Sequence, residues 1–142
     1  MQISSRFSVA VHVLTLLATN PPGELLTSDR MADSVNTNPV VIRRILGQLK
    51  KAGLVEVRAA AGGTYLLRDP ATITLLEVYR AVDVVETHLF SIHQKPNPHC
   101  VVGRTIQAAL DTTLGRAQAA LEGELAATTL AQVVASVRQP AD

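Results

Sequence analysis

Residues 36–69 read NTNPVVIRRILGQLKKAGLVEVRAAAGGTYLLRD, and this stretch decides the fold. The pair Asn38 and Pro39 is typical of a helix start, because the asparagine side chain can cap the first turn and proline lacks an N–H that would go unbonded there. Gly53 is typical of a helix end, and the two lysines before it suit the negative end of the helix dipole. The pattern therefore predicts a basic helix over residues 39–52.

A β-hairpin is expected directly after this helix. Residues 54–58 and 64–68 are predicted as strands, and the segment AAAGG between them offers glycine for a turn that needs a positive φ. Two helices are expected before the basic helix, over residues 5–19 and 28–34. The order helix, helix, turn, helix and hairpin is the winged helix-turn-helix pattern.

The first two helices carry recognisable start signals. Ser4 or Ser5 is expected to cap the first helix, and Thr27 or Ser28 the second. His12 is expected on or near the buried side of the first helix, as a core histidine with its hydrogen bonds satisfied. The apolar stripe predicted for that helix comprises Phe7, Val11, Leu14, Leu17 and Ala18.

The C-terminal half is also expected to be mainly helical. The segments TLLE at 74–77 and TLAQ at 129–132 fit capping boxes, so they predict one helix to about Asp83 and a terminal helix. Residues 87–99 read as a mostly irregular loop, and the Asn–Pro pair at 97–98 predicts the start of a long helix that runs to roughly residue 126.

Apolar side chains recur along this long helix at steps of four and three. Because such a stripe is too apolar to face water, we expect a second copy of the chain to cover it. The expected fold is mainly α with a small β-hairpin wing, a winged helix-turn-helix with a long C-terminal dimerisation helix. We divide the chain into residues 1–83, the winged helix-turn-helix, and 84–142, a loop and the dimerisation helices. The stripe comprises Val102, Ile106, Leu110, Leu114, Ala117, Leu121 and Leu125.

Composition narrows the class of protein. Hydrophobic residues make up 47% of the chain, which is ample for a core, and a single cysteine excludes an internal disulfide. The apolar segment near the N-terminus is too short to span a membrane and lacks the features of a signal peptide, so we expect a cytoplasmic protein. Residues 1–68 hold 8 Lys or Arg and 4 Asp or Glu, a charge of +4, whereas residues 69–142 hold 5 and 8, a charge of −3. The basic half favours an anionic partner.

The basic helix offers a face suited to DNA. Its core side would be Ile42, Ile45, Leu46 and Leu49, and a helix of this size fits the major groove, where arginine binds guanine or phosphate and valine touches thymine methyls. Arg58, at the start of the hairpin, can reach the minor groove or the backbone. The charges alone also fit an ordinary solvated face, but the order of elements and the wing arginine favour DNA. The exposed face comprises Val40, Arg43, Arg44, Gly47, Lys50 and Lys51.

Four segments carry a resemblance to a known family: SSRFSVAVHVLTLLA at 4–18, VIRRILGQLKKAGLVEVR at 41–58, GGTYLL at 62–67 and ITLLEVYRAVD at 73–83. They are similar to the Rrf2 family of bacterial transcription regulators, and the resemblance covers nearly the whole chain. It implies a homodimeric DNA-binding repressor whose long helix crosses its twin. The contacts it implies are Asn38, Val40, Val41, Arg43 and Arg44 in the recognition helix, and Arg58 in the wing.

The wing departs from the pattern of that family. The family usually reads R-G-x-x-G-G there, whereas this chain reads R-A-A-A-G-G, so Ala59 replaces a glycine and a different wing-tip conformation is expected. The complete set of expected DNA-binding residues comprises Ser4, Ser5, Ser28, Asn38, Val40, Val41, Arg43, Arg44, Lys50, Arg58, Gly62 and Gly63.

Members of the family that bind an iron–sulfur cluster carry three cysteines before the long helix. This chain has one, Cys100, which matches the last of the three, and one thiolate cannot replace three. We therefore expect neither an iron–sulfur cluster nor another cofactor, and the chain resembles the cluster-less, YwnA-like branch of the family.

Cys100 is nevertheless a candidate sensor. It is expected in the first turn of the long helix beside His99, and both a helix N-terminus and an imidazole favour a thiolate. His88 and His93 lie in the same segment, so thiol sensing, binding of a soft metal and an inert thiol beside surface histidines all remain open. The spacing matches no defined metal motif, so no metal site is predicted.

No catalytic constellation is visible, so an enzyme is not expected. The expected function is a sequence-specific DNA-binding regulator, and we expect it to be a repressor. It would act as a homodimer on an inverted-repeat operator and respond to a redox or small-molecule signal. The alternatives are a winged-helix protein-interaction module that does not bind DNA, and a regulator that senses a metal or a thiol reagent. The sequence does not specify the operator, the regulated genes or the effector.

Overall fold

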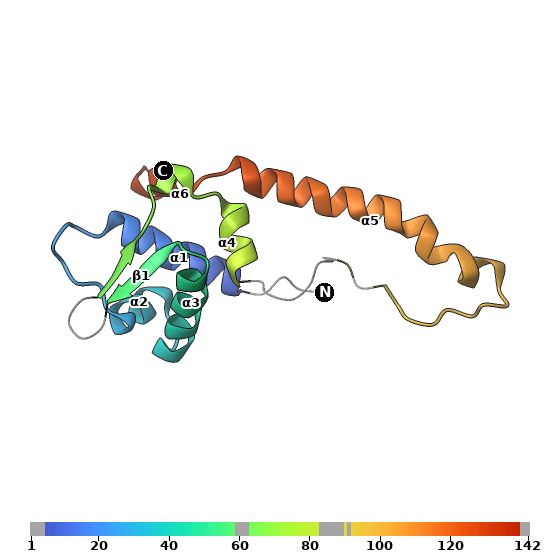
Figure 1. Cartoon of the computed structure of the whole chain (residues 1–142), viewed down its shortest axis with the longest axis horizontal. Coiled ribbons are helices and arrows are strands. Elements are labelled where there is room, and N and C mark those ends of the chain that lie inside the picture. The colour runs from blue at the N-terminus through green and yellow to red at the C-terminus, as the bar shows by residue number, and fades with distance from the viewer. Residues whose placement is uncertain (1–4, 59–62, 83–89, 91, 140–142) are drawn as a thin grey trace.

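The computed structural model describes residues 5–58, 63–82, 90 and 92–139. Short helices and one hairpin form a body at one end, and a single long helix leads away from it (Figure 1). The elements are, in chain order, α1 (Arg6–Thr19), α2 (Ser28–Val35), α3 (Pro39–Lys51), β1 (Val55–Arg58), β2 (Gly63–Leu66), the 3₁₀-helix η2 (Pro70–Thr72), α4 (Leu75–Val82), α5 (Val101–Ala127) and α6 (Leu130–Arg138).

The helices that frame the helix-turn-helix begin at the predicted caps. The Thr27 hydroxyl accepts a hydrogen bond from the Arg30 N–H at 3.2 Å, and the side-chain Oδ1 of Asn38 accepts one from the Val40 N–H at 2.9 Å. Asn36 turns the chain between α2 and α3 in a left-handed conformation, with φ of 64°, which asparagine tolerates better than most residues. These local interactions fix where α3 starts.

The core of α3 is the one predicted from the sequence. Ile42, Ile45, Leu46 and Leu49 are all buried. Ile45 and Leu49 pack with buried residues of α1, α4 and α6, whereas Ile42 and Leu46 pack with α1 and α2. Because α3 is held from both sides, its opposite face is fixed in direction and remains exposed.

The prediction for α1 was wrong in detail. The buried residues are Ala10, Val13, Leu14 and Thr15, and Phe7 is only half-buried. His12 is exposed, and its Nε2 lies 2.9 Å from the Ser34 hydroxyl on α2. The physical reason is that α1 contacts α2, α3, α4 and α6, so its buried face is wider than the predicted stripe and includes Ala10 and Val13 beside Leu14.

Ser5 occupies the N-cap position of α1 but does not cap it. Its backbone is already helical, with φ of −63° and ψ of −10°, and its side chain makes no capping hydrogen bond. A capping side chain requires an extended backbone at that position. The other candidate cap, Ser4, lies outside the described residues.

The hairpin is shorter than expected. β1 and β2 pair antiparallel, with Glu56 opposite Tyr65 and Arg58 opposite Gly63. β2 ends at Leu66, two residues before the predicted end, because Arg68 turns away to contact the segment that follows. The departure predicted at Ala59 lies outside the described residues.

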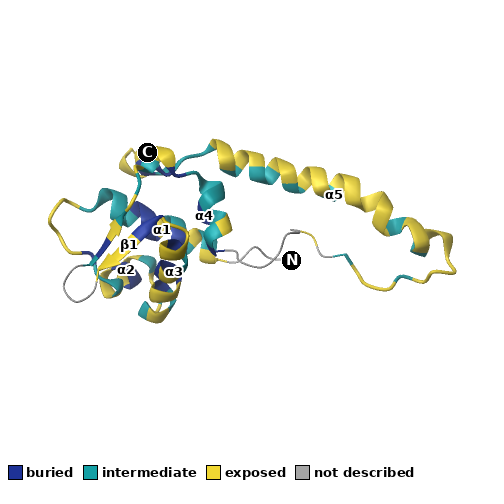
Figure 2. Cartoon of the chain, viewed as in Figure 1, coloured by how far each residue is buried: buried dark blue, intermediate teal, exposed yellow. Residues whose placement is uncertain are grey.

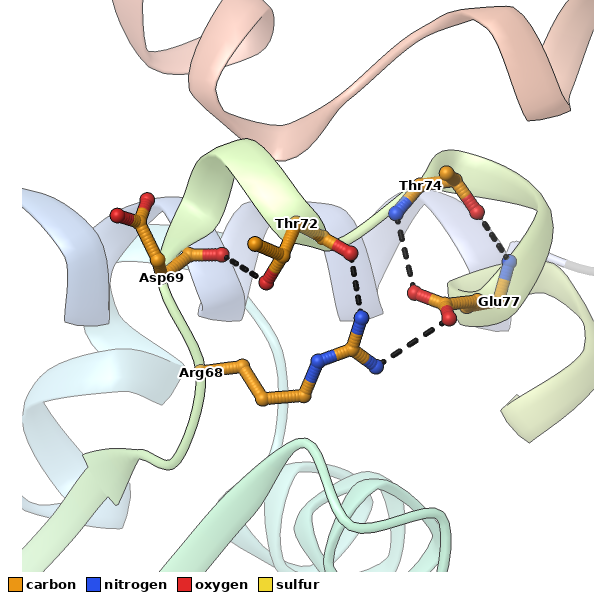
Figure 3. A network of polar contacts seen from close by, with 5 residues as sticks. All are labelled: Arg68, Asp69, Thr72, Thr74 and Glu77. Atoms are coloured by element: carbon orange, nitrogen blue, oxygen red, sulfur yellow. Dashed lines mark hydrogen bonds and ion pairs between the residues drawn. The ribbon is translucent and has the colours of Figure 1, made fainter.

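A polar network ties the wing to the start of α4 (Figure 3). The Arg68 guanidinium donates to the Thr72 carbonyl and to Glu77 Oε1, the latter at 3.2 Å. Glu77 Oε2 accepts from the Thr74 N–H at 3.1 Å, and the Thr74 hydroxyl accepts from the Glu77 N–H at 3.2 Å. These last two bonds are the predicted capping box, and Arg68 extends it to the wing.

The last helix, α6, returns to the body. Thr129 and Gln132 form the second predicted capping box, and Leu130 and Val134 are buried in the core that α1 and α4 share. The Leu130 N–H donates to the Ile73 carbonyl at 2.8 Å. The division of the chain after residue 83 stays a prediction. The terminal helix α6, which was assigned to the second part, packs against the winged helix-turn-helix.

The long helix starts three residues later than predicted. Asn97 Oδ1 accepts from the His99 N–H at 2.9 Å and thereby stabilises a separate turn, whereas α5 begins at Val101. Cys100 occupies the N-cap position with an extended backbone, so it does not lie in the first helical turn. The helix ends at Ala127, close to the predicted residue 126.

Candidate nucleic-acid interface

The exposed face of α3 is basic over most of its length. Val40 is 52% exposed, and Arg43, Arg44, Lys50 and Lys51 are all exposed on the side opposite the buried residues. Within the described part of the chain, none of the four cations of this face forms an ion pair. This face is therefore available to an anionic partner.

Two further residues of the recognition helix were predicted to contact DNA. Asn38 is exposed, but its side-chain Oδ1 accepts the capping hydrogen bond, so its side-chain Nδ2 is the group left for another contact. Val41 is half-buried and packs against the core, which leaves its side chain only partly accessible.

The wing arginine lies on a defined surface. The Arg58 guanidinium carbon is 4.6 Å from the centre of the Tyr65 ring, and its Nε is 3.7 Å from Glu56 Oε2. An arginine over an aromatic ring gains a cation–π interaction and loses some freedom of movement. Its side chain is still 59% exposed, so it can meet a partner outside the chain.

Tyr65 and Glu56 were not among the residues predicted for the site. Alternation along a strand places Glu56 and Arg58 on one face of β1, but which residue of β2 lies opposite depends on the register. The register pairs Glu56 with Tyr65. The length of the hairpin turn would have been needed to find this contact from the sequence.

The start of β2 is set by a close contact. Gly63 has φ of 71°, and a Cβ built on it would collide with the side chain of Leu25. The positive φ favours glycine there, whereas the exposed Leu25 side chain could move to make room for a larger residue. Gly62, the other predicted wing glycine, lies outside the described residues.

The serines predicted to contact phosphate differ in how exposed they are. Ser5 is exposed beside the start of α1, and Ser28 is half-buried at the first position of α2. Backbone N–H groups at helix starts can bind phosphate oxygens. Thr27, however, already caps α2 by accepting from the Arg30 N–H.

The candidate sensor residues do not form a cluster in the described structure. Cys100, His93 and His99 are exposed, and the Asn97 side chain bonds the backbone of His99 and not its ring. His88 lies outside the described residues. Among the described residues, no three His, Cys, Asp or Glu side chains are grouped so that they could hold a metal ion.

The predicted dimerisation stripe is open to solvent along α5. No residue of this helix is buried, and Figure 2 shows α5 exposed along most of its length, whereas buried residues gather in the helices of the body. Val102 is 64% exposed and Leu110 is 37% exposed. Ala117 is exposed as well, and the other members are half-buried: Ile106, Leu114, Leu121 and Leu125.

No helix in the described part of the chain is both long and apolar enough to cross a membrane.

Comparisons with known proteins agree with this geometry. Residues 3–136 match the family described as Rrf2, iron-dependent transcriptional regulator. Over 132 residues the chain is 50% identical to YwnA of Bacillus subtilis strain 168, whose name assigns it to transcriptional regulators of the helix-turn-helix type. The match covers 93% of this chain and 96% of YwnA.

Solved structures share the fold. A crystal structure described as that of a DNA binding protein is 48% identical, with a TM-score of 0.73, over 91% of this chain and 98% of the other. A transcriptional regulator from Lactobacillus plantarum has a TM-score of 0.82 at 23% identity, over 97% and 93% of the two chains. These matches confirm the predicted fold class, a mainly helical winged helix with a long C-terminal helix.

The description of the matched family names iron, which requires suitable donor atoms. The whole chain contains one cysteine, and that cysteine is exposed. One thiol does not supply the ligand set of an iron–sulfur cluster, which is normally four cysteines or a mixture of cysteine and histidine. The described residues therefore do not fit such a cluster, and no step proposed below passes through a metal.

Proposed function

Because the chain belongs to the Rrf2 family of transcriptional regulators, we propose that it is a sequence-specific DNA-binding repressor that acts as a homodimer on an inverted-repeat operator. The observation that carries this proposal is the exposed face of α3, which holds four cations without ion pairs in the described chain; the wing adds a further exposed arginine, Arg58. The relatives are regulators of transcription and not enzymes.

In the proposed complex, α3 enters the major groove. The N-terminal residues of a recognition helix reach base edges, so Val40, Arg43 and Arg44 are the proposed base-reading residues. Arginine donates two hydrogen bonds to guanine, and valine packs against a thymine methyl group. Lys50, in the last turn, is proposed to contact phosphate.

The wing is proposed to contact the adjacent minor groove. Arg58 is held over Tyr65, and its charge suits the negative potential of a narrow minor groove. Ser5, Ser28 and Gly63 are proposed to contact the backbone, where such contacts fix register without reading sequence.

The proposed dimer forms through α5. An amphipathic helix of 27 residues that buries nothing within its own chain needs another surface, and a second copy of the same helix provides a symmetric one. Two recognition helices related by a two-fold axis then require an operator with two inverted half-sites about one turn of DNA apart. Binding there would block access of RNA polymerase to the promoter.

The first experiment is a selection from random duplex DNA with the purified full-length protein, read by sequencing. We expect an enriched inverted repeat. The affinity for that repeat should fall steeply as salt rises, because neutralising phosphates releases counterions. A folded, reduced protein that enriches no sequence would contradict the proposal and favour a protein-interaction module.

A further inference from the structure

Gly47 is a glycine in the interior of α3 that neither the backbone conformation nor the surrounding space requires. Gly23, Gly53 and Gly63 have φ of 84°, 78° and 71°, values that favour glycine. Gly103 is needed for space, because an added Cβ would collide with the Asn97 backbone. Gly47 has an ordinary helical backbone, and nothing lies within 4 Å of a Cβ built on it.

The glycine weakens the helix in which it lies. Glycine in a helix interior costs about 0.5–1 kcal/mol relative to alanine, since it has more freedom to lose on folding. Alanine would fit at position 47 without a contact to any other residue. The fold of the chain therefore does not require glycine at position 47, just as it does not at Gly115 and Gly123, and what distinguishes Gly47 is its place on the basic face of α3.

Gly47 lies in the middle of the basic face of α3. Residues three and four positions apart are neighbours on a helix surface. Arg43 and Arg44 thus lie one turn before Gly47, and Lys50 and Lys51 lie one turn after it. A methyl group at this position would project from the exposed face between these four cations.

We propose that Gly47 marks the place where DNA comes closest to the backbone of α3, and that the missing side chain makes room for it. The inference rests on the proposed function and adds a positioning residue to it. The proposed base-reading arginines lie one turn before this position and two lysines suited to phosphate lie one turn after it, so DNA would pass directly over Gly47, and glycine is the residue that lets a backbone approach a ligand closely.

The test compares Gly47→Ala with Gly123→Ala in the full-length protein. Gly123 is an exposed glycine of α5 outside the apolar stripe, and nothing lies within 4 Å of its added Cβ either. Both variants make the same chemical change in a helix, but only one lies on the face proposed to meet DNA. Thermal unfolding and fluorescence anisotropy with the selected operator are measured for each.

Both variants are expected to unfold a few degrees higher than the parent, because alanine favours helix. Gly47→Ala should nevertheless bind the operator at least tenfold more weakly, and Gly47→Ser should lose binding similarly. Gly123→Ala should bind as the parent does. A change that stabilises the protein and weakens binding cannot be attributed to unfolding.

Equal operator binding by Gly47→Ala, Gly47→Ser and the parent would overturn this inference and leave the proposed function standing. A parent that binds no DNA at low salt would overturn both. Weaker binding in Gly123→Ala as well as in Gly47→Ala would also overturn the inference, since the loss would then not be specific to the α3 face.

Discussion

At the scale of single residues, the two arginines of α3 carry the proposed sequence recognition. Arg43→Ala and Arg44→Ala are each expected to weaken operator binding by about 1–3 kcal/mol if the arginine reads a guanine. Both side chains are exposed, so neither change should lower the stability of the fold. Anisotropy titrations with the selected operator and with operators changed at one base pair measure the effect.

The pattern across sequences separates base reading from phosphate binding. A base-reading arginine should lose its preference at one position of the half-site when replaced by alanine. Lys50→Ala is the matched comparison, since it should weaken binding to all sequences and reduce the salt dependence. A uniform loss in the arginine variants would assign these residues to phosphate contact.

Capping could be predicted residue by residue because it depends on neighbours in the sequence. Asn38, Thr27 and the two capping boxes behave as their side chains require. The prediction failed at Ser5, where the backbone is already helical, and at Asn97, which stabilises its own turn instead of starting α5. In both places a suitable side chain is present, but the backbone conformation that the cap needs does not occur there.

At the scale of elements, the wing depends on the Tyr65 ring. Tyr65→Leu removes the surface on which Arg58 lies, and a cation–π contact at an exposed site is worth about 0.5–1 kcal/mol, so operator affinity should fall roughly two- to fivefold. Tyr65→Phe keeps the ring and should bind like the parent. Anisotropy titrations at fixed salt compare the variants.

A change at Glu56 is expected to have the opposite effect on operator affinity. Its carboxylate lies 3.7 Å from Arg58 Nε and competes with phosphate for that cation. Glu56→Gln should therefore raise DNA affinity modestly and steepen its salt dependence. If neither Tyr65→Leu nor Glu56→Gln changes binding, the wing arginine does not contribute to the complex.

The junction between the wing and α4 makes a separate prediction about stability. Glu77→Ala removes the acceptor for the Thr74 N–H and the partner of Arg68, and a lost cap costs about 0.5–2 kcal/mol. Glu77→Gln keeps a capping oxygen and loses only the partly exposed ion pair, which is worth roughly 0–1 kcal/mol. Urea unfolding should rank the parent first, then Glu77→Gln, then Glu77→Ala. Equal loss in both variants would assign the effect to the ion pair.

The existence of the six α-helices and of the hairpin could be predicted from apolar spacing, caps and turn glycines, whereas the short helix η2 and the contacts between elements could not. The stripe predicted on α1 missed Ala10 and Val13 because a helix contacted by four others buries a wider face than one stripe. The end of β2 was misplaced because Arg68 bonds the segment beyond the strand. Contacts between elements distant in the sequence decided both outcomes.

At the scale of the whole molecule, the position of α6 could not be predicted from the sequence. Its capping box was visible in the sequence, but the return of Leu130 to the core of the winged helix was not. The Thr74–Thr129 bridge joins the start of α4 to the start of α6, so the two ends of the segment 74–129 meet at one place on the body. The long helix between them is thus anchored at its C-terminal end to the DNA-binding part.

The anchored helix leads to the last prediction, which concerns assembly. Leu114→Glu places a charge in the apolar stripe of α5, where burial against a second copy would leave that charge unpaired. Thr112→Glu adds the same charge two residues earlier, on the other side of the helix and outside the stripe. Light scattering after size exclusion should show a dimer for the parent and for Thr112→Glu, and a monomer for Leu114→Glu.

Operator binding should follow assembly. A monomer engages one half-site at a time, so Leu114→Glu should lose on the order of a hundredfold or more in affinity for the full operator, while Thr112→Glu should not. Because no residue of α5 is buried within its own chain, the winged helix should still fold in both variants, whereas the unfolding temperature of Leu114→Glu should fall only by the contribution that dimer formation makes. A Leu114→Glu protein that stays dimeric would place the interface elsewhere, and the spacing of half-sites could then not be derived from α5.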